Sequence, residues 1–307
     1  MAYTDREDLN YLGQLFLIGQ NKTPLLNMMG GLTGGGKTTK SFNFPVAQPW
    51  SLNAAGQNAT SEALAAVAGT PETYARAQVY NTCQIMKYDY ASTFAKQSTY
   101  GEMSGLSIQG VQPVTDEFAF QKAAALKQMA VDIEFSMFKG AYVAQNTSAT
   151  VAKTRGLGAA ITTNEVVAAG AKLTKDMIDE LLLEMAGNGS EFNNMVIFAN
   201  AFNIDVLNDI YSYAPEDRNI GGTNLKTIIT PFAEFGLSYE PQIATDDIYF
   251  VDMSVMYPVF CPYNGQVIAD IDTAVVAAAK GGFLYTQFGL DYGPETFHGK
   301  ISGTATA

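Results

Sequence analysis

The spacing of apolar residues predicts one long helix near the middle of the chain. Between residues 115 and 143 apolar positions recur every three or four residues, as on a helix with buried faces. Asp116 and Glu117 lie in the predicted first turn, where negative charge favours the helix dipole. At 1.5 Å per residue this helix would span ~40 Å, so we expect it to act as a spine. Its two apolar stripes are Phe118, Leu126, Met129, Ile133 and Met137, and Phe120, Ala124, Val131, Phe135 and Phe138.

Residues 42–95 follow a different pattern. Apolar and polar residues alternate with period two at both ends, in 41–46 and 84–90, around a middle rich in Ala, Gly, Asn and Thr. This pattern predicts a long two-stranded excursion with a loose tip. An isolated two-stranded hairpin is marginal in water, so we expect it to lie on something else, such as another copy of the chain.

The remaining segments predict a mixture of helices and strands. Amphipathic helices are expected over 174–186 and 203–213, and strands over 194–198, 226–230 and 248–252, with a strand-like end over 282–301. The alternation of helix and strand after residue 154 is typical of a compact second lobe. Both lobes are therefore expected to be built from discontinuous segments.

The first 41 residues combine a polar start, an apolar patch and a glycine-rich stretch, which predicts an arm without a core of its own. The patch at 11–18 would pack either on its own chain or on a neighbour. No charged-then-apolar signal segment follows the acidic start, so we expect folding in a cytoplasm. No apolar run reaches the ~18 residues that would span a bilayer, so no membrane insertion is expected.

Composition and charge narrow the function. Hydrophobic residues make up 47% and charged residues 16%, below the roughly one quarter charged that is typical, so much surface should be hidden against partners. The net charge of -12 and the scattered basic residues argue against nucleic-acid binding. Cys83 and Cys261 are far apart in sequence and form no metal-ligand motif, which excludes a structural zinc site.

One motif points to nucleotide chemistry and requires a structural context. The stretch from Gly31 through Gly36, Lys37 and Thr38 matches the phosphate-binding pattern GxxxxGK[ST]. That loop works only between a buried strand and a helix whose N-terminus helps to bind the phosphates. Residues 38–46 instead carry alternating aromatics and Pro45, which predicts extended structure. We therefore interpret the stretch as a glycine-rich hinge and expect no cofactor there.

Other candidate chemistry is sparse. His298 is the single histidine, lies in a strand-like segment and has no GxSxG partner motif. The acidic pairs Asp246 with Asp247 and Asp270 with Asp272 match no metal-loop pattern and are expected in solvated loops. The 16 Tyr and 18 Phe residues fit core and intersubunit packing better than base stacking. No catalytic residue, no metal and no enzymatic activity are predicted.

The order of segments resembles the major capsid proteins of tailed bacteriophages with the Hong Kong phage capsid fold, and in particular the SU-type podophage subgroup. Four blocks carry the resemblance, through their order and spacing. They are 81–86 running past Gly101 into the long helix with Gln121, Asp132 and Glu134; 154–157 with Asn164, the 173–186 helix and 187–189; 196–199 with its following helix; and 281–283 through 295–301.

The resemblance implies an α+β fold with an N-terminal arm, an extended hairpin loop, a peripheral domain and an axial domain. The arm would be 1–41 and the loop 42–95; the peripheral domain would be 96–153, 223–262 and 282–307 with the spine helix 115–143; the axial domain would be 154–222 and 263–281. It implies a structural virion protein that assembles in the host cytoplasm as hexamers and pentamers into an icosahedral shell around double-stranded DNA.

Further expectations concern partners. Scaffold, portal and decoration proteins are candidate partners, whereas sequence-specific DNA binding and membranes are not expected. Some members of the fold crosslink through a Lys–Asn isopeptide bond promoted by a Glu, but no such trio can be placed here, so none is expected. The alternatives are a P-loop nucleotide-binding enzyme and a non-phage nanocompartment shell protein. The residues expected at intersubunit contacts are Leu12, Leu15, Phe16 and Leu17 of the arm and Phe42, Phe44 and Trp50 near the hairpin base.

Overall fold

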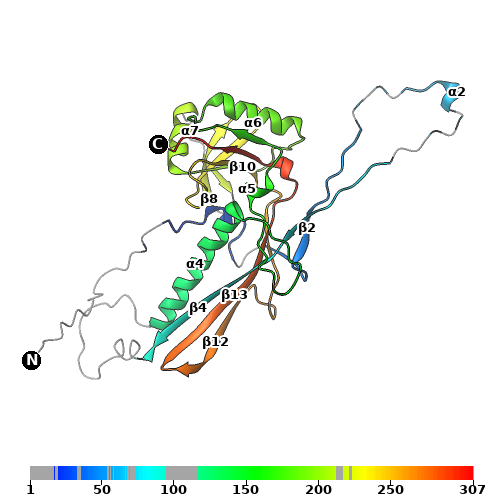
Figure 1. The fold of residues 1–307 in the computed structure, drawn as a ribbon. Helices are drawn as coiled ribbons and strands as arrows, with labels where there is room; N and C mark the ends of the chain where they lie inside the picture. Colours follow the sequence, from blue (N-terminus) through cyan, green and yellow to red (C-terminus); the bar gives the residue numbers. More distant parts are fainter. Residues whose placement is uncertain are drawn as a thin grey trace, which may run out of the picture.

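The computed structural model has a rounded lobe, a layer of long strands that runs down from it beside a helix, and a thin excursion that projects to one side (Figure 1). It belongs to the α+β class. The residues that it describes are 17, 20–32, 36–53, 55, 57, 59–65, 67, 69, 73–94, 117–211, 217–220 and 223–306.

The predicted spine is α4, Glu117–Lys139. Four residues of the first predicted stripe, Phe118, Met129, Ile133 and Met137, are buried, whereas Leu126 is 39% exposed. The second stripe is only partly buried, because Phe138 is fully enclosed while Phe135 remains 46% exposed. The helix therefore presents part of its apolar surface outward.

The long strands form a five-stranded sheet around β13, Ala279–Asp291. On one side β13 pairs antiparallel with all ten residues of β4, Gln84–Thr93. On the other side it pairs antiparallel with β12, Ile268–Ala277, and with β11, Tyr257–Phe260. The short β1, Lys37–Thr38, extends the sheet parallel to β11. Figure 1 shows β4, β13 and β12 running side by side next to α4.

The rounded lobe contains a seven-stranded sheet in the order β5-β14-β10-β6-β9-β8-β7. Its central strands, β6 and β10, are buried at every position, which explains why they are apolar throughout except for Asp252 at the end of β10. Helix α6 begins after Thr174, whose hydroxyl accepts a hydrogen bond from the Met177 N–H at 3.4 Å. The elements are β5 Glu165–Val167, α6 Lys175–Gly187, β6 Met195–Ala199, α7 Ala201–Tyr211, β7 Asp217–Ile220, β8 Thr223–Ile229, β9 Glu234–Tyr239, β10 Ile248–Asp252 and β14 Gly299–Ser302, with the short α5 Leu157–Ala160 and η1 Glu295–Phe297 nearby.

The excursion is a two-stranded ribbon, as the alternating pattern predicts. Strand β2, Asn43–Ala47, pairs antiparallel with β3, Val79–Thr82, and a bridge between Trp50 and Arg76 continues the ribbon outward. A short helix, α2 Glu62–Ala65, lies near the far end in Figure 1. The expected return strand 84–90 is not part of this ribbon, because it forms β4 of the five-stranded sheet.

The division of residues between the two lobes differs from the one expected. Residues 223–252, expected beside the spine, form β8 to β10 of the seven-stranded sheet, and β14 from the 282–307 segment joins them. Residues 263–281, expected in the axial domain, include β12, which turns directly back onto β13 beside the spine. Alternation predicts strands but not their partners, and both differences follow from pairing.

The two lobes share a core at the C-terminal end of α4. The ring of Phe138 lies 5.5 Å from the ring of Phe198 on β6 and 5.4 Å from that of Tyr249 on β10, measured between centroids. Helix α1, Pro24–Met28, buries Leu25 and Leu26 in the same core. The last part of the arm is therefore built into the body of the molecule.

Candidate functional site

The excursion exposes large apolar side chains. Trp50 and Leu52 are 59% and 71% exposed, and Leu64 on α2 is 66% exposed. Trp50 and Tyr74 face each other across the ribbon with ring centroids 6.4 Å apart. The exposed set is Trp50, Leu52, Leu64, Val67, Tyr74 and Tyr80. Apolar groups gathered on a thin projection indicate a surface that a partner covers.

The contact residues expected from the sequence lie in different environments. Leu17 and Trp50 are exposed, whereas Phe42 is half-buried. Phe44 is buried in a small cluster with Cys83 and Val259, so it anchors the ribbon to its own chain and is not available to a neighbour. Leu12, Leu15 and Phe16 lie outside the described residues.

Helix α1, which forms the root of the arm where the arm joins the body, is held by a buried carboxylate. Glu134 on α4 is fully buried, and its two oxygens accept hydrogen bonds from the N–H groups of Leu25 and Leu26 at 2.7 and 2.8 Å. These N–H groups belong to the first turn of α1, where helix N–H groups lack partners in the helix itself. Glu134 thereby fixes α1 against the spine.

A second buried carboxyl faces Glu134. Glu240, just after β9, is fully buried and accepts from the Gln242 N–H at 2.8 Å through Oε1. Its Oε2 is enclosed and has no hydrogen-bond partner among the atoms of the described residues. A proton on this oxygen could be donated to Glu134.

Burial raises the pKa of both carboxyls. For Glu240 the negative charge of Glu134 raises the pKa further, while the Gln242 N–H and Lys139 partly oppose the rise. For Glu134 the hydrogen bonds from Glu240 and from the two α1 N–H groups oppose it. We infer that the pair retains one proton at neutral pH, because two adjacent buried carboxylates would repel each other.

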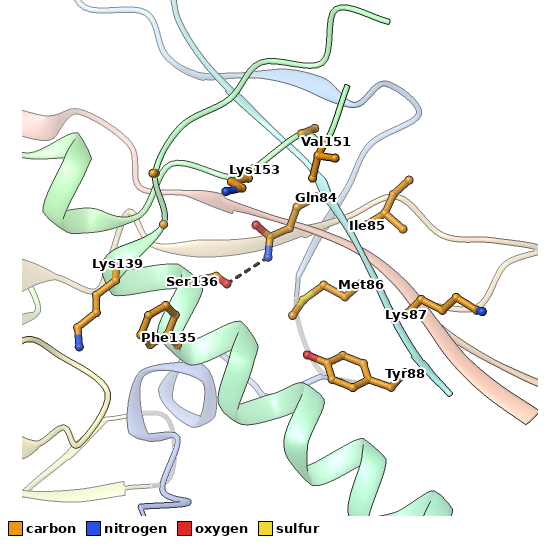
Figure 2. A pocket seen from close by; sticks show the side chains of 13 residues that line it. Gln84, Ile85, Met86, Lys87, Tyr88, Phe135, Ser136, Lys139, Val151 and Lys153 are labelled. Carbon is orange, nitrogen blue, oxygen red and sulfur yellow. Dashed lines mark hydrogen bonds between the residues drawn. The ribbon is translucent and has the colours of Figure 1, made fainter. Parts of the chain in front are cut away.

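A pocket of about 560 Å³ lies where α4, β4 and the segment 151–153 meet. The Gln84 side chain bridges two of these segments. Its Nε2 donates to Ser136 Oγ at 3.1 Å, the bond drawn in Figure 2, and its Oε1 accepts from the Thr154 N–H at 3.2 Å. Met86 and Tyr88 extend from β4 toward the helix. Lys87, Lys139 and Lys153 also line the pocket, and none of the lining residues is acidic.

The stretch that matches the phosphate-binding pattern leads into strands. Lys37 and Thr38 form β1 beside β11, and β2 follows. The Lys37 ammonium lies 2.6 Å from the buried Asp291 Oδ2 and over the Tyr257 ring, 4.4 Å from its centroid. A Cβ at Gly36 would lie 2.9 Å from the Phe260 ring and the Pro258 carbonyl, so this glycine allows close packing. The helix that a phosphate-binding loop requires after its Lys and Thr is replaced by strand.

The lone histidine is a packing element. His298 is fully buried between η1 and β14, its Nδ1 accepts from the Asp252 N–H at 3.1 Å, and its Nε2 lies 2.6 Å from the Tyr292 carbonyl oxygen. Since Nδ1 accepts, Nε2 carries the proton and donates it. Burial lowers the pKa of His298, although its hydrogen bond to Tyr292 opposes this. The neutral ring thus links the end of β10 to the segment that precedes β14.

The acidic pairs, which were expected in solvated loops, make structural contacts, and Asp270 and Asp272 lie in β12. Asp270 contacts the Tyr90 hydroxyl and the Lys122 ammonium, and Asp247 accepts from the Tyr249 hydroxyl at 2.9 Å.

Both cysteines are free thiols. Within the described ranges no group of three or more His, Cys, Asp or Glu side chains could hold a metal ion. Among the same residues no helix is long and apolar enough to cross a bilayer.

Sequence reasoning missed the pocket lysines and the carboxyl pair. A signal existed for Glu134, since it falls between Ile133 and Met137 on the apolar stripe of α4, where a charged residue needs a partner. No local pattern could have found Glu240 or predicted that Lys87 and Lys153 line one pocket, because that pocket is created by tertiary packing.

One comparison with known proteins identifies a family. A family model described as SU10 major capsid protein matches residues 2–305. A search of curated proteins gave no match.

Solved structures show the same architecture. The capsid of cyanophage A-1(L) is similar with a TM-score of 0.64 at 13% identity, over 99% of this chain and 99% of that one. The SrpI encapsulin complex from Synechococcus elongatus PCC 7942 gives 0.58 at 10% identity, over 89% and 86%. The capsid of cyanophage P-SCSP1u gives 0.55 at 8% identity, over 96% and 92%. At such identities the likeness shows the fold alone, and the expected Hong Kong phage-type fold is confirmed.

Proposed function

This chain belongs to the SU10 major capsid protein family and is a capsid-forming structural protein of a bacteriophage virion, and we propose that it closes an icosahedral shell as hexamers and pentamers around double-stranded DNA. Family and fold indicate a structural role and not an enzymatic one. Assembly in the host cytoplasm, with scaffold, portal and decoration proteins as further partners, belongs to the same proposal.

The observation that carries the proposal is the exposed apolar ribbon. A two-stranded ribbon is marginally stable by itself, and this one presents Trp50, Leu52 and Leu64 to solvent in the single chain. Burying each such side chain against a neighbour would contribute ~1.5–3 kcal/mol before the cost of association. Repetition around closed symmetry would then make a stable shell from individually weak contacts.

The charge of the chain suits a container for DNA. A net charge of -12 repels phosphates, so the wall would enclose the genome without adhering to it broadly. Lys37, the lysine of the nucleotide-binding pattern, forms an ion pair with Asp291 at one end of the five-stranded sheet. This arrangement favours a structural use of that stretch.

The test is assembly by the purified chain, alone and with its candidate scaffold, followed by sedimentation and negative-stain imaging. The variant Leu52→Asp/Leu64→Asp should reduce particles at least tenfold with an unchanged circular dichroism spectrum, because the ribbon would no longer bury apolar surface. The matched control Leu52→Met/Leu64→Met keeps that surface and should assemble normally.

Closed particles, tubes or hexameric sheets would support the proposal. A wild-type chain that stays monomeric under both conditions would contradict it. Titration of a fluorescent ATP analogue with magnesium would then test the alternative, for which micromolar binding lost in Lys37→Ala is required. Particles filled with an enzyme cargo would instead favour a nanocompartment.

A deletion that tests the arm must keep helix α1, because α1 is bound to the body of the molecule. Deleting residues 1–30 would also remove Leu25 and Leu26 and leave the Glu134 carboxylate buried without their N–H groups. Deleting residues 1–16 leaves these contacts in place, and we expect that variant to fold normally and to form no shells.

A further inference from the structure

The pocket between α4 and β4 gathers lysines that are scattered in sequence. Lys87 belongs to β4, Lys139 is the last residue of α4 and Lys153 follows the spine, yet all three line this pocket of about 560 Å³. None of the lining residues is acidic, although the chain as a whole carries -12. Folding therefore creates a cationic surface in an acidic protein, and such a surface attracts an anionic ligand.

The three positive charges differ in how far they are compensated. Lys87 pairs with the exposed Asp89 at 2.8 Å, which offsets part of its charge. Lys139 lies over the Phe135 ring, 5.1 Å from its centroid, so a cation–π contact orients its ammonium without neutralising it. Lys153 is exposed and forms no ion pair with any residue that the structure describes. Lys153 thus offers the least compensated charge of the three.

The backbone around the pocket is fixed before any ligand binds. The Gln84 amide is bonded both to Ser136 on the helix and to the Thr154 backbone. Lys153 and Val143 exchange two backbone hydrogen bonds, each of 3.0 Å. Binding at this surface would therefore have to order lysine side chains but not the chain that carries them, which lowers its cost.

The arrangement of the lysines fits a row of anions better than a single anion. In Figure 2 the side chains of Lys87 and Lys139 point away from each other, to opposite sides of the view, and Lys153 comes from a third segment. One small anion could not contact side chains that diverge in this way. A nucleic-acid backbone could, because its phosphates follow one another at intervals of about 3.4 Å of helix axis per strand.

The lining also favours phosphate over carboxylate. A lysine ammonium is a compact charge that suits phosphate oxygens, whereas carboxylates form their strongest pairs with the planar fork of arginine. No arginine is among the lining residues. Ile85, Phe135 and Val151 are 53%, 46% and 74% exposed and add an apolar part to the same surface, against which the sugars of a backbone can pack.

We propose that this lysine-lined pocket faces the interior of the shell and binds phosphates of the enclosed DNA. The inference rests on the proposed function, which supplies both the shell and the DNA. Lysines that contact only phosphates carry no sequence information, so the binding would not depend on base sequence. Each site would be weak, but many copies of it would face a high local concentration of phosphate. The rest of the acidic wall would still repel DNA, so contact would be confined to these points.

Acetylation of lysines in DNA-filled and emptied particles tests which side the pocket faces. A small amine-reactive reagent is applied to both kinds of particle, and each modified lysine is quantified by mass spectrometry. Lys153 should react at least fivefold faster in emptied particles, whereas Lys172, an exposed lysine on the other lobe, should react equally in both. Equal reactivity of Lys153 in the two would overturn the proposal. Equal protection would do so too, because a protein partner would then cover the pocket.

Binding of a labelled DNA duplex to the unassembled chain tests the contact itself. Fluorescence anisotropy is measured between 50 and 300 mM salt. Two to three phosphate contacts predict a slope of log affinity against log salt between about -2 and -3, since each contributes about -0.9. Lys153→Gln should reduce the slope by ~0.9 and the affinity at 0.1 M salt about eightfold, which is the value of one such contact relative to 1 M salt.

Lys153 is the residue to change because its side chain holds no other part of the fold. Its backbone hydrogen bonds with Val143 remain in Lys153→Gln, whereas Lys139 also acts on the buried Glu240 and its loss would change stability. The matched control Lys172→Gln should leave slope and affinity unchanged. Equal binding by wild type and Lys153→Gln would overturn the proposal. A labelled poly-glutamate peptide that binds at least as tightly as the duplex, and loses this in Lys153→Gln, would assign the pocket to an acidic protein segment instead.

The two proposals fail in different ways. If the chain forms no particles, the shell function itself is wrong. If particles form and enclose DNA, but Lys153 is equally reactive in filled and emptied particles or Lys153→Gln binds the duplex like wild type, the DNA contact is wrong while the shell function stands.

Discussion

Replacing Glu240 by glutamine should remove the pH dependence of stability that the buried carboxyl pair gives to this protein. Burial and the neighbouring Glu134 raise the pKa of Glu240, so the native chain holds a proton that the unfolded chain releases. A group that binds more protons in the native state makes stability fall as the pH rises. Glutamine keeps the shape, stays neutral and can still donate to Glu134.

The size of the effect follows from proton counting. Unfolded glutamates titrate near pH ~4.3, so at pH 6 to 8 the unfolded chain has lost the proton that the native pair retains. One such proton costs the wild type ~1.4 kcal/mol of unfolding free energy per pH unit, or ~2.7 kcal/mol over those two units. The variant lacks this slope, so it should gain ~2.7 kcal/mol relative to wild type between pH 6 and pH 8.

Urea unfolding of unassembled protein, followed by circular dichroism at pH 6, 7 and 8, measures this difference. Amide exchange at Leu25 and Leu26 gives a local readout, because their N–H groups bond to Glu134. Glu180→Gln is the control, since it removes an exposed carboxylate from α6 and should leave the slope unchanged. Parallel slopes for wild type and Glu240→Gln would refute the shared proton.

Three further outcomes are expected. Burial would raise the pKa of Glu295, but the hydrogen bonds that residues 162 and 163 donate to its carboxylate outweigh this and lower the pKa. Glu295→Gln should therefore be less stable than wild type at neutral pH. In urea titrations this difference should shrink as the pH falls through the range in which carboxyls titrate. Gly156→Ala would place a Cβ 2.6 Å from the Gly140 nitrogen and 2.7 Å from the Ser136 carbonyl oxygen. Thermal unfolding should therefore show that the free energy of unfolding falls by a value on the order of 3 kcal/mol. The control Gly187→Ala should change it negligibly, because nothing lies within 4 Å of the Cβ added there. Lys37→Met removes the half-exposed partner of Asp291 and should cost about 1 kcal/mol or less in urea unfolding while particles still form; a loss of assembly would assign that lysine a further role.

The sequence predicted the elements that depend on local pattern. The spine, the ribbon and the strand at 195–199 could be read from periodicity because each buries a face or a whole strand against the core. Which strand pairs with which could not be predicted from the local sequence. Strand β9 pairs parallel with β6, and β12 folds back on β13, and neither arrangement leaves a mark on the alternation of either strand. The exchange of segments between the two lobes follows from this.

The contact surfaces were predictable in kind but not in position. Low charge and a ribbon without a core indicate a protein that needs neighbours, yet the same apolar pattern contains Phe44, which is buried in its own chain, and Trp50, which is exposed. Both look alike in sequence, and what separates them is Gly289, whose missing side chain leaves room for the Phe44 ring. The pocket lysines pose the same problem, since Lys87 and Lys153 line one pocket only because β4 meets the segment after the spine. Assembly surfaces are made from residues that folding leaves uncovered, so locating them requires the packing of the whole chain, whereas the need for them is already visible in its composition.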